Sequence, residues 1–435
     1  MQQEMRPFAG LETDLHPPLD AHESSVEADR CYFCHDAPCV TACPTGIDIP
    51  MFIRQIQTGN PAGSAKTIFD ENILGGMCAR VCPTETLCEQ VCVRQTAENK
   101  PVKIGALQRF ATDHLMRKGG HPYQRAQSTG KSVAVIGAGP AGLSCAHRLA
   151  RYGHDVTIID SGAKPGGLNE YGIASYKTVN NFAQEEVEFV LGIGGISINS
   201  ETTLGTDVSL QELVDQYDAV FLGVGLDSVN RSAVAGGDLD GVVDAVKFIA
   251  ELRQAADYSS ISVGRRVVVI GGGMTAIDAA VQARMLGAED VTIAYRRSQA
   301  KMNASPYEQQ LAQTHGVKIK HNVQPLRIIA DNQTVSGLEL EYTTETNNSL
   351  SGTGETFVEN ADQVLMAIGQ AFDVKAAEAF GLAMNNRRLH VDANRKTSHE
   401  KIWAGGDCID AGEDLTVWAV QDGKLAAESI HQSLS

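Results

Sequence analysis

The chain has 435 residues, 43% of them hydrophobic, and a formal net charge of −17 at pH 7. This length predicts roughly three domains, and the acidic balance argues against a nucleic-acid partner, because binding phosphate needs clustered Lys and Arg. Residues 1–30 lack a basic start followed by an apolar run, and no segment reaches the roughly 18 uninterrupted apolar residues of a membrane span. We therefore expect a cytoplasmic protein.

We expect residues 1–30 to form a polar arm that leads into a cysteine-rich region. Most of the cysteines lie there in two runs, Cys31-x2-Cys34-x4-Cys39-x3-Cys43-Pro44 and Cys78-x3-Cys82-x5-Cys88-x3-Cys92. Cytosolic reductants keep thiols free, so cysteines at this density indicate metal rather than disulfides. Short helices, predicted over residues 50–57, 62–69 and 104–116, complete a small helical domain around the metal.

The spacing of the first run favours iron–sulfur clusters over zinc. Structural zinc usually takes paired C-x2-C knuckles, whereas only Cys31 and Cys34 have that spacing. In two-cluster ferredoxins the fourth cysteine of a comparable run ligates the other cluster, which predicts interleaved ligands here too. One 4Fe-4S cluster would then take Cys31, Cys34, Cys39 and Cys92, and the second would take Cys43, Cys82 and Cys88. For the open ligand of the second cluster, residue counting nominates Cys78, which lies on the same helical face as Cys82.

A glycine- and proline-containing linker over residues 118–130 precedes a predicted βαβ unit. The unit consists of strands over 133–136 and 156–159 and a helix over 141–152. Directly after the first strand comes the segment Gly137-Ala138-Gly139-Pro140-Ala141-Gly142. Its glycines permit a tight turn, close approach of a pyrophosphate and close packing of helix on strand, and the phosphate meets the helix N-terminus. Asp160 is the acid expected to accept the ribose hydroxyls, so we predict a dinucleotide site.

A second copy of this unit begins at residue 267, with strands over 267–270 and 291–294 and a helix that ends near residue 286. Its turn is Gly271-Gly272-Gly273-Met274-Thr275-Ala276, and Arg296 and Arg297 stand where the first copy has its acid. An acid suits a free ribose 2′-hydroxyl, whereas arginine accommodates a 2′-phosphate. We therefore assign FAD to the first site and a nicotinamide nucleotide to the second, NADPH in preference to NADH. The alternative is that both arginines are ordinary surface charges.

Two apolar strands that end in glycine, over residues 219–226 and 364–369, are each expected to stop beneath a bound cofactor. The segment 402–407 and a helix over 416–431 complete the predicted organisation. Cys145 is expected to be a small core residue and Cys408 to pack near the flavin. Neither has a cysteine partner at C-x4-C spacing, so a redox-active disulfide is not expected.

Five segments carry a family resemblance: Cys34-His-Asp-Ala-Pro-Cys39, Cys43-Pro-Thr, Val81-Cys-Pro-Thr84, Leu87-Cys88 and Ile104-Gly-Ala-Leu-Gln-Arg-Phe-Ala-Thr-Asp113. Together they resemble the electron-input half of dihydropyrimidine dehydrogenase. The resemblance continues through both nucleotide sites to Ala426 and so covers nearly the whole chain. The glutamate synthase small subunit shares this architecture, but its helix after the clusters typically carries Glu where this chain has Gln108.

The resemblance implies a different fourth ligand for the second cluster. In the family that cluster takes a glutamine from the helix after the cysteines, and Gln108 falls at the matching position. The family's cysteine that matches Cys78 does not bind iron. We therefore expect the second ligand set to be Cys43, Cys82, Cys88 and Gln108, whereas without the resemblance Gln108 would be an exposed helix residue. A neutral amide in place of a thiolate makes the cluster less negative, which by charge alone eases its reduction.

The resemblance also implies a fold. It is α/β with an N-terminal α-helical iron–sulfur domain and two Rossmann-like nucleotide-binding domains of the disulfide-reductase type, lacking the redox disulfide. We expect residues 1–125 to hold two 4Fe-4S clusters, residues 126–237 and 371–435 to bind FAD, and residues 238–370 to bind NAD(P)H.

Further cofactor contacts follow from the resemblance alone. The flavin contacts are Gly167, Leu168, Lys177, Leu226, Asp407, Thr416 and Val417. The nicotinamide nucleotide contacts are Gly272, Gly273, Met274, Thr275, Ala367, Ile368 and Gly369. A family arginine that helps to hold the 2′-phosphate is replaced by Asn303 here, which weakens the assignment to NADPH without removing Arg296 and Arg297.

These residues predict an NAD(P)H-dependent flavin and iron–sulfur oxidoreductase. Electrons enter as a pair and leave singly, and the chain needs no general acid or base because the cofactors carry the reaction. The family's pyrimidine-reducing half is an FMN-bearing barrel without a counterpart here. We therefore expect a hetero-oligomer with a separate FMN-containing catalytic subunit that reduces uracil or thymine. The alternatives are the glutamate synthase small subunit and a general electron-transfer module for ferredoxin-like partners.

Overall fold

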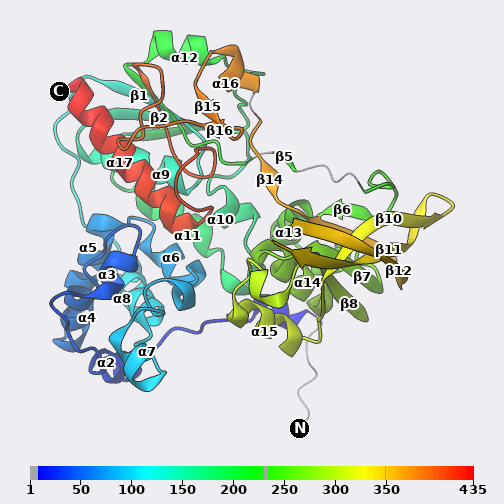
Figure 1. Ribbon diagram of the computed structural model, residues 1–435. Helices are drawn as coiled ribbons and strands as arrows, with labels where there is room; N and C mark the ends of the chain where they lie inside the picture. Colours follow the sequence, from blue (N-terminus) through cyan, green and yellow to red (C-terminus); the bar gives the residue numbers. More distant parts are fainter. Residues whose placement is uncertain (1–7, 227, 230–233, 348, 374) are drawn as a thin grey trace. The chain divides into compact units, whose positions relative to one another are not determined.

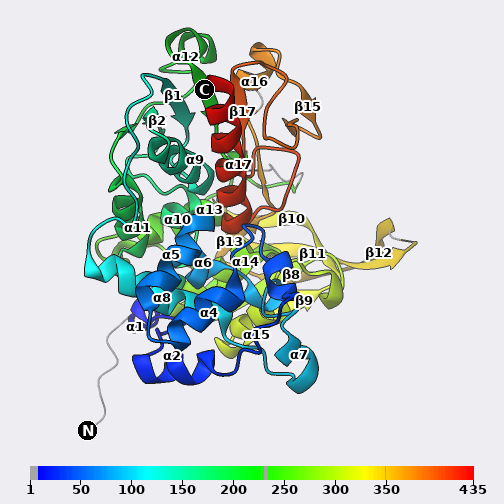
Figure 2. The same ribbon diagram turned by 90° about the vertical axis from the view of Figure 1, so that its left-hand side faces the viewer.

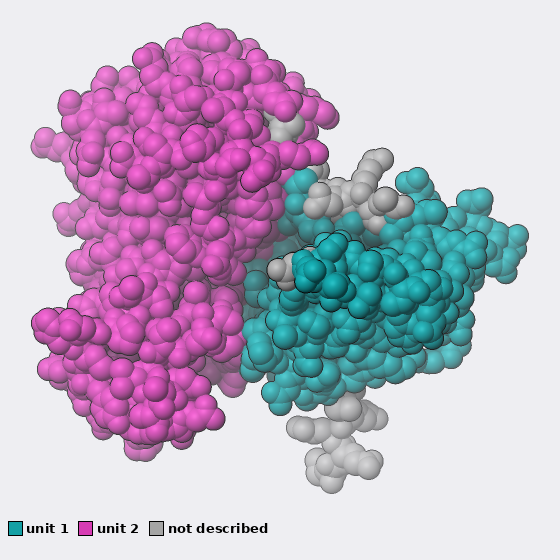
Figure 3. Space-filling view, viewed as in Figure 1, with its two compact units in different colours: residues 1–15, 171–179, 228–371 teal, residues 16–170, 180–227, 372–435 magenta. Residues whose placement is uncertain are grey.

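The computed structural model describes residues 8–226, 228–229, 234–347, 349–373 and 375–435. They fall into two compact units, drawn in separate colours in Figure 3. Unit 1 comprises residues 1–15, 171–179 and 228–371, and unit 2 comprises residues 16–170, 180–227 and 372–435. Unit 1 thus includes two short segments from outside the predicted nicotinamide domain. The three-domain division stays a prediction.

Unit 2 begins with the helical region that carries the cysteines (Figure 1). Side-chain caps explain where two of its helices begin, because Asp48 accepts a hydrogen bond from the N–H of Met51 and Asn60 accepts one from the N–H of Gly63. Each of these helices also has a proline in its first turn, where a missing N–H costs nothing. The elements are α2 (Ala21–Ala28), α3 (Pro38–Ala42), α4 (Ile49–Gln57), α5 (Pro61–Glu71), α6 (Gly75–Val81), η1 (Thr84–Thr86), α7 (Val93–Glu98) and α8 (Ile104–Lys118).

Two sequence predictions in this part of the chain need correction. Residues 1–30 are more than a polar arm, because α1 (Ala9–Glu12) buries Leu11 in the core of unit 1 and α2 begins at a capping box between Asp20 and Glu23. The predicted linker lacks helix and strand over residues 119–130, but it is not free of the fold. Its Tyr123 is buried and donates a hydrogen bond to Asp70 Oδ1 over 2.9 Å.

The first parallel sheet, in unit 2, carries the first nucleotide turn. Its strand order is β17-β4-β1-β2-β3, and all neighbouring strands are parallel. The predicted strand over 219–226 is shorter than expected and ends at Leu222. The strands are β1 (Ser132–Ile136), β2 (Asp155–Ile159), β3 (Ile196–Asn199), β4 (Ala219–Leu222) and β17 (Ile402–Ala404), with a small hairpin of β15 (Met384–Asn385) and β16 (Arg388–Leu389). The helices are α9 (Pro140–Arg151), α10 (Leu168–Tyr171), α11 (Phe182–Leu191), α12 (Leu210–Gln216), α16 (Lys375–Ala379) and α17 (Thr416–Leu434).

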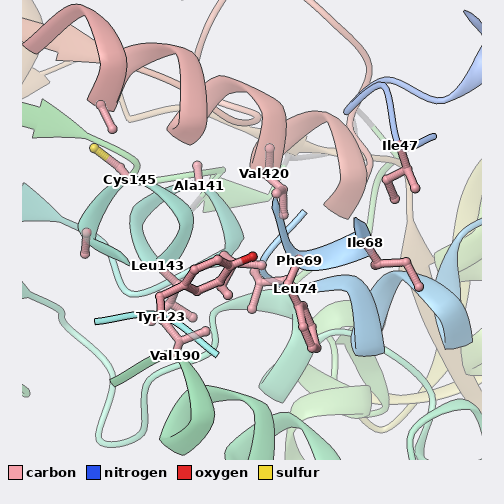
Figure 4. Close-up of a cluster of buried hydrophobic side chains, with 14 of the residues drawn as sticks. Ile47, Ile68, Phe69, Leu74, Tyr123, Ala141, Leu143, Cys145, Val190 and Val420 are labelled. Atoms are coloured by element: carbon pink, nitrogen blue, oxygen red, sulfur yellow. The ribbon is translucent and has the colours of Figure 1, made fainter. Parts of the chain in front are cut away.

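One hydrophobic core joins the helical region to the first sheet. Phe69 and Leu74 of the helical region pack in one cluster with Leu143 of α9, Val190 of α11 and Val420 of α17 (Figure 4). None of these side chains is more than 2% exposed, and full burial of such a side chain stabilises the fold by roughly 1.5–3 kcal/mol. The cysteine-bearing helices and the first nucleotide-binding sheet therefore share one interior.

The second parallel sheet, in unit 1, has the strand order β6-β13-β7-β8-β9. Its strands are β6 (Val242–Asp244), β7 (Arg266–Gly271), β8 (Asp290–Tyr295), β9 (Lys318–His321) and β13 (Gln363–Ala367). The other elements are α13 (Ala245–Gln254), η2 (Ser175–Lys177), η3 (Tyr258–Ser260), α14 (Met274–Met285), η4 (Gln299–Lys301), α15 (Pro306–Thr314), β5 (Ser228–Val229) and β14 (Gln370–Ala371).

An antiparallel sheet in unit 1 has no counterpart in the sequence prediction (Figure 2). It consists of β10 (Val323–Asp331), β11 (Thr334–Thr346) and β12 (Ser349–Asn360). Apart from this sheet, the expected α/β class with a helical N-terminal region is confirmed. None of the helices in the described ranges is long and apolar enough to cross a membrane.

Candidate cofactor sites

The first nucleotide turn joins β1 to α9. Gly137 has a φ of 98°, and a Cβ there would overlap the carbonyl oxygen of Gly223. A Cβ on Gly142 would in turn overlap the carbonyl oxygen of Gly137. The first and third glycines therefore have the geometry that the motif requires, a tight turn and close packing of helix on strand.

The middle glycine of this turn faces open space. Gly139 is the N-cap of α9, and the nearest atom to a Cβ built on it would be the Cα of Gly167 at 3.9 Å. This cradle suits a phosphate group, which would accept hydrogen bonds from the free amides of the helix N-terminus. A Cβ on Gly167 would lie only 2.7 Å from the Cα of Gly139, so the loop with this predicted flavin contact lies against the turn. Leu168, which follows, is 37% exposed.

Asp160 directs its carboxylate to the backbone of the same region. Its Oδ2 accepts a hydrogen bond from the N–H of Ala138 over 2.6 Å, and its Oδ1 accepts one from the N–H of Gly162 over 2.7 Å. The acid therefore fixes the shape of the nucleotide turn. Its predicted contact with the ribose stays a prediction.

The chain's last strand and helix bring further predicted flavin residues to this sheet. Thr416, at the start of α17, donates a hydrogen bond to Asn169 Oδ1 over 2.9 Å, and Val417 is buried. Asp422, which the sequence did not single out, accepts a hydrogen bond from the N–H of Gly406 over 2.9 Å. Burial, followed by repulsion from Asp414, raises the pKa of Asp407 to about 7.

Leu226 and Cys408 lie near the end of β4. Leu226 is half-buried in the segment that follows this strand. Cys408 is fully buried, and its thiol lies 3.6 Å from the carbonyl oxygen of Leu222 and 3.4 Å from that of Gly405. Cys145 is likewise buried in α9, as expected for a core residue.

The second nucleotide turn, in unit 1, repeats the geometry of the first. Gly271 has a φ of 146°, and a Cβ there would overlap the carbonyl oxygen of Ala367, its partner across β7 and β13. The predicted strand over 364–369 thus ends at Ala367, and Ile368 and Gly369 continue past it. Gly273 is the N-cap of α14, and nothing lies within 4 Å of a Cβ built on it. Met274 and Thr275 form the first turn of α14, so both copies keep an open middle glycine at a helix N-terminus.

Arg296 and Arg297 follow β8 directly. Arg296 is exposed, whereas Arg297 is partly buried and its Nε lacks a hydrogen-bond partner in the described part of the chain. A buried guanidinium nitrogen without a partner is costly, and a phosphate oxygen would satisfy it. Asn303 is exposed.

Lys177 lies in unit 1, within the segment 171–179. Its Nζ is 2.8 Å from Asp278 of α14 and 2.8 Å from Glu308 of α15. Burial opposes the charged form, but the two carboxylates outweigh it and raise the pKa of Lys177. Sequence reasoning missed both acids, although Asp278 is a lone acid on the buried part of an otherwise apolar helix. The flavin contact of Lys177 stays a prediction.

The four thiols predicted for the first cluster line one cavity. Cys31, Cys34, Cys39 and Cys92 surround it together with apolar side chains, and about 370 Å³ of the space is not filled by protein atoms. Burial raises the pKa of Cys31, and that of Cys39 to about 12. In the described ranges no three His, Cys, Asp or Glu side chains converge on one metal ion. Four thiols around a volume rather than a point suit a polynuclear iron–sulfur cluster, whose irons would stabilise the thiolates.

A second group of thiols gathers at the end of α6. The N–H of Cys82, the C-cap residue, donates to the carbonyl oxygen of Cys78 over 3.0 Å. A hydrogen bond with the Cys78 thiol, burial, and the nearby thiols of Cys88 and Cys43 raise the pKa of Cys82. The structure therefore brings Cys43, Cys82 and Cys88 together, and it places Cys78 beside them.

Gln108 is buried on α8, so the alternative of an exposed helix residue is wrong. Its Nε2 donates to the carbonyl oxygen of Gly75, the first residue of α6, over 2.7 Å. One turn earlier, the N–H of Gly105 donates over 3.0 Å to Glu89, the residue after Cys88. These bonds tie α8 to both segments that hold the second group of thiols. They leave the amide oxygen of Gln108 as the atom suited to a metal, and ligation stays a prediction.

Two family models match the chain. Residues 131–423 match the model described as pyridine nucleotide-disulphide oxidoreductase. The chain belongs to this family. Residues 11–120 match a model described as dihydropyrimidine dehydrogenase domain II, 4Fe-4S cluster. Family membership implies FAD and NAD(P)H, and the N-terminal match implies 4Fe-4S chemistry, so the expected class of NAD(P)H-dependent flavin and iron–sulfur oxidoreductase is confirmed.

The chain is similar over nearly its whole length to two kinds of bacterial protein. It is 34% identical over 440 residues to the glutamate synthase [NADPH] small chain of Escherichia coli, covering 96% of this chain and 93% of that one. It is 36% identical over 408 residues to the NAD-dependent dihydropyrimidine dehydrogenase subunit PreT of Salmonella typhimurium, covering 94% of each. These similarities confirm the resemblance that the motifs indicated.

Among solved structures, the family fold is found in Mycobacterium tuberculosis FprA in complex with NADPH, with a TM-score of 0.59 and 17% identity over 70% of this chain and 84% of that one. It is also found in T. acidophilum thioredoxin reductase, with a TM-score of 0.56 and 20% identity over 69% of this chain and 98% of that one. At these identities the similarity concerns the fold alone.

Proposed function

We propose that this chain is the NAD(P)H-oxidising subunit of a dihydropyrimidine dehydrogenase. It would bind FAD at the first nucleotide turn, NADPH or NADH at the second, and two 4Fe-4S clusters at the two groups of thiols. A separate FMN-containing subunit would receive the electrons and reduce uracil or thymine. The cavity lined by Cys31, Cys34, Cys39 and Cys92 carries this proposal, because it adds an electron exit to a flavin oxidoreductase fold.

The chain's own residues would bind and orient the cofactors. When bound, FAD exchanges electrons in pairs with a nicotinamide, whereas iron–sulfur clusters take them one at a time. The N-terminus of α9 would neutralise the pyrophosphate, and the loop at Gly167 would cover it. Asp407, with a pKa raised to about 7 by burial, can hold a proton at neutral pH beside the predicted flavin position. No side chain needs to act as a general acid or base.

NADPH is the proposed donor in preference to NADH. Arg296 and Arg297 follow the second strand of the nucleotide fold, where the adenosine ribose is held. The unsatisfied Nε of Arg297 supports this choice, and Asn303 in place of the family arginine speaks against it. The names of the relatives fall on both sides, one being NADPH-linked and the other NAD-dependent.

The second candidate is a glutamate synthase small subunit, which the similar identity of the Escherichia coli protein favours. Mixing the FAD- and iron-loaded chain with each candidate partner distinguishes the two. We expect NAD(P)H-dependent reduction of uracil with the FMN-containing subunit and no reaction with a glutamate synthase large subunit given glutamine and 2-oxoglutarate. The reverse result would refute the proposal, and failure with both partners would favour a general electron-transfer module.

A further inference from the structure

We propose that Lys424 and Thr45 raise the reduction potential of the second iron–sulfur cluster through its ligand Cys43. The inference rests on the proposed function insofar as Cys43 must ligate iron. It assigns a tuning role to a lysine on the C-terminal helix, almost 380 positions along the chain from the threonine that it contacts.

A continuous set of contacts connects Lys424 to Cys43 within unit 2. Lys424 lies on α17 and is 7% exposed, and its Nζ donates to the carbonyl oxygen of Thr45 over 3.0 Å. Thr45 is 2% exposed, and its Oγ1 lies 3.3 Å from the Sγ of Cys43. A buried positive charge is therefore separated from a predicted cluster ligand by a single threonine.

The direction of the effect follows from which atom can donate. In the free protein either the Thr45 hydroxyl or the Cys43 thiol could be the donor. Once Cys43 binds iron as a thiolate, only the hydroxyl has a proton to donate. Reduction adds negative charge to a cluster, and hydrogen bonds to its sulfurs and net charge around it set its potential. A donated hydrogen bond and a nearby ammonium both stabilise the reduced state, and burial strengthens both effects.

Glu71 supplies the opposing charge. Its Oε2 lies 2.8 Å from Lys424 Nζ, so the two side chains form an ion pair. The Glu71 side chain is 43% exposed, whereas that of Lys424 is 9% exposed. Water therefore screens the carboxylate more than the ammonium, and the positive end of the pair is the one that contacts Thr45. Removing either partner should shift the potential in opposite directions.

The position of Lys424 on α17 suits this role. Thr416 and Val417, in the first turn of the same helix, are predicted flavin contacts, and Lys424 lies about 12 Å further along the helix axis. A buried ammonium is costly to the fold, and an apolar side chain of similar volume would often be at least as stabilising. One helix thus carries both the flavin-side residues and the charge beside the second cluster.

The test uses the full chain loaded with FAD and iron. Five variants are compared with the wild type, Lys424→Met, Lys424→Arg, Glu71→Gln, Thr45→Val and Thr45→Ser. The midpoint potential of each cluster is measured by redox titration followed by EPR spectroscopy, and the second cluster is the signal altered by Gln108→Ala. Iron content and reduction of FAD by NADPH are recorded for every protein.

We expect Lys424→Met to lower the ratio of reduced to oxidised second cluster about tenfold at a fixed solution potential, which is about 59 mV for a one-electron couple. Thr45→Val should lower it by less, and Glu71→Gln should raise it. Lys424→Arg and Thr45→Ser keep the charge and the hydroxyl and should stay near the wild type. The first cluster should keep its potential in all five.

Unchanged potentials in loaded Lys424→Met and Thr45→Val proteins would overturn the inference, and so would equal shifts of both clusters. If Lys424→Met fails to hold the cluster, Thr45→Val and Glu71→Gln decide by the sign of their shifts. A wild-type chain with no cluster at Cys43 would overturn the ligand set and this inference together. A wild type with both clusters but no uracil reduction would refute only the proposed function.

Discussion

Glu186 Oε1 accepts a hydrogen bond from the N–H of Met77 over 2.9 Å and so joins α11 of the first nucleotide-binding region to α6 of the cysteine region. Beside it, the guanidinium of Arg80 lies 3.3 Å from the centroid of the Phe182 ring. Arg80 also donates to both carboxylate oxygens of Asp113, over 2.9 and 3.0 Å. A buried polar network therefore holds the helix that ends at Cys82.

The Glu186 carboxyl should make stability depend on pH. Burial is the main cause that raises its pKa to about 8, against the hydrogen bond from Met77 and the charge of Arg80. The folded state thus binds this proton more tightly than the unfolded state, so the stabilising contribution is present below the unfolded pKa and is lost as pH rises through about 8. Glu186→Gln keeps an oxygen acceptor and removes the titration.

Between about pH 5 and about pH 9, the free energy of unfolding of the wild type should therefore fall by a few kcal/mol relative to Glu186→Gln, at roughly 1.4 kcal/mol per pKa unit. Urea unfolding of both proteins across this range measures the difference. Parallel curves would contradict a raised pKa.

Arg80→Met should destabilise the protein by about 3–5 kcal/mol, because it leaves the Asp113 carboxylate buried without its closest partner. Arg117 provides the matched control, since it also pairs with Asp113, over 3.1 Å, but its side chain is 71% exposed. Arg117→Met should cost no more than about 1 kcal/mol. Chemical denaturation measures both changes, and equal losses would show that burial does not govern this network.

Replacing Arg296 and Arg297 by alanine should raise KM for NADPH at least about tenfold, which is about 1.4 kcal/mol of binding. KM for NADH should change little, because NADH carries no 2′-phosphate. Steady-state reduction of an artificial acceptor measures both constants without a partner subunit. A variant in which the two constants rise together would mean that these arginines do not select the nucleotide.

Cys78→Ala and Gln108→Ala should have opposite consequences for the second cluster. The alanine at position 78 should leave both EPR signals and the iron content intact, because the thiol beside Cys82 is predicted not to bind iron. The alanine at position 108 should alter one signal only, because it removes a ligand. Loss of a signal in Cys78→Ala with both signals kept in Gln108→Ala would return the site to four cysteines.

The parts of the fold that the sequence predicted are those with local causes. The turns at Gly137 and Gly271 need particular residue types over a few positions, and the apolar strands before them are short and continuous. The first group of thiols was predictable for the same reason, because Cys31, Cys34 and Cys39 are close in the chain.

Features that depend on distant packing were not predictable. Lys424 has no local pattern that indicates contact with Thr45, and Glu186 is an unremarked acid on a helix until α6 lies against it. Strands β10–β12 alternate buried and exposed residues along a polar sequence rich in Thr and Glu, so no apolar run marked them. Gln108 required a family resemblance, because a single amide on a helix has no spacing to interpret.

The core that Phe69 and Leu74 share with Leu143 and Val420 bears on how this molecule can be divided. A break within residues 118–130 would fall between two stretches of sequence that look like separate modules, yet it would leave an apolar face in water on each side. The cysteine-bearing helices and the first sheet therefore belong to one heritable piece, whose two halves must change together.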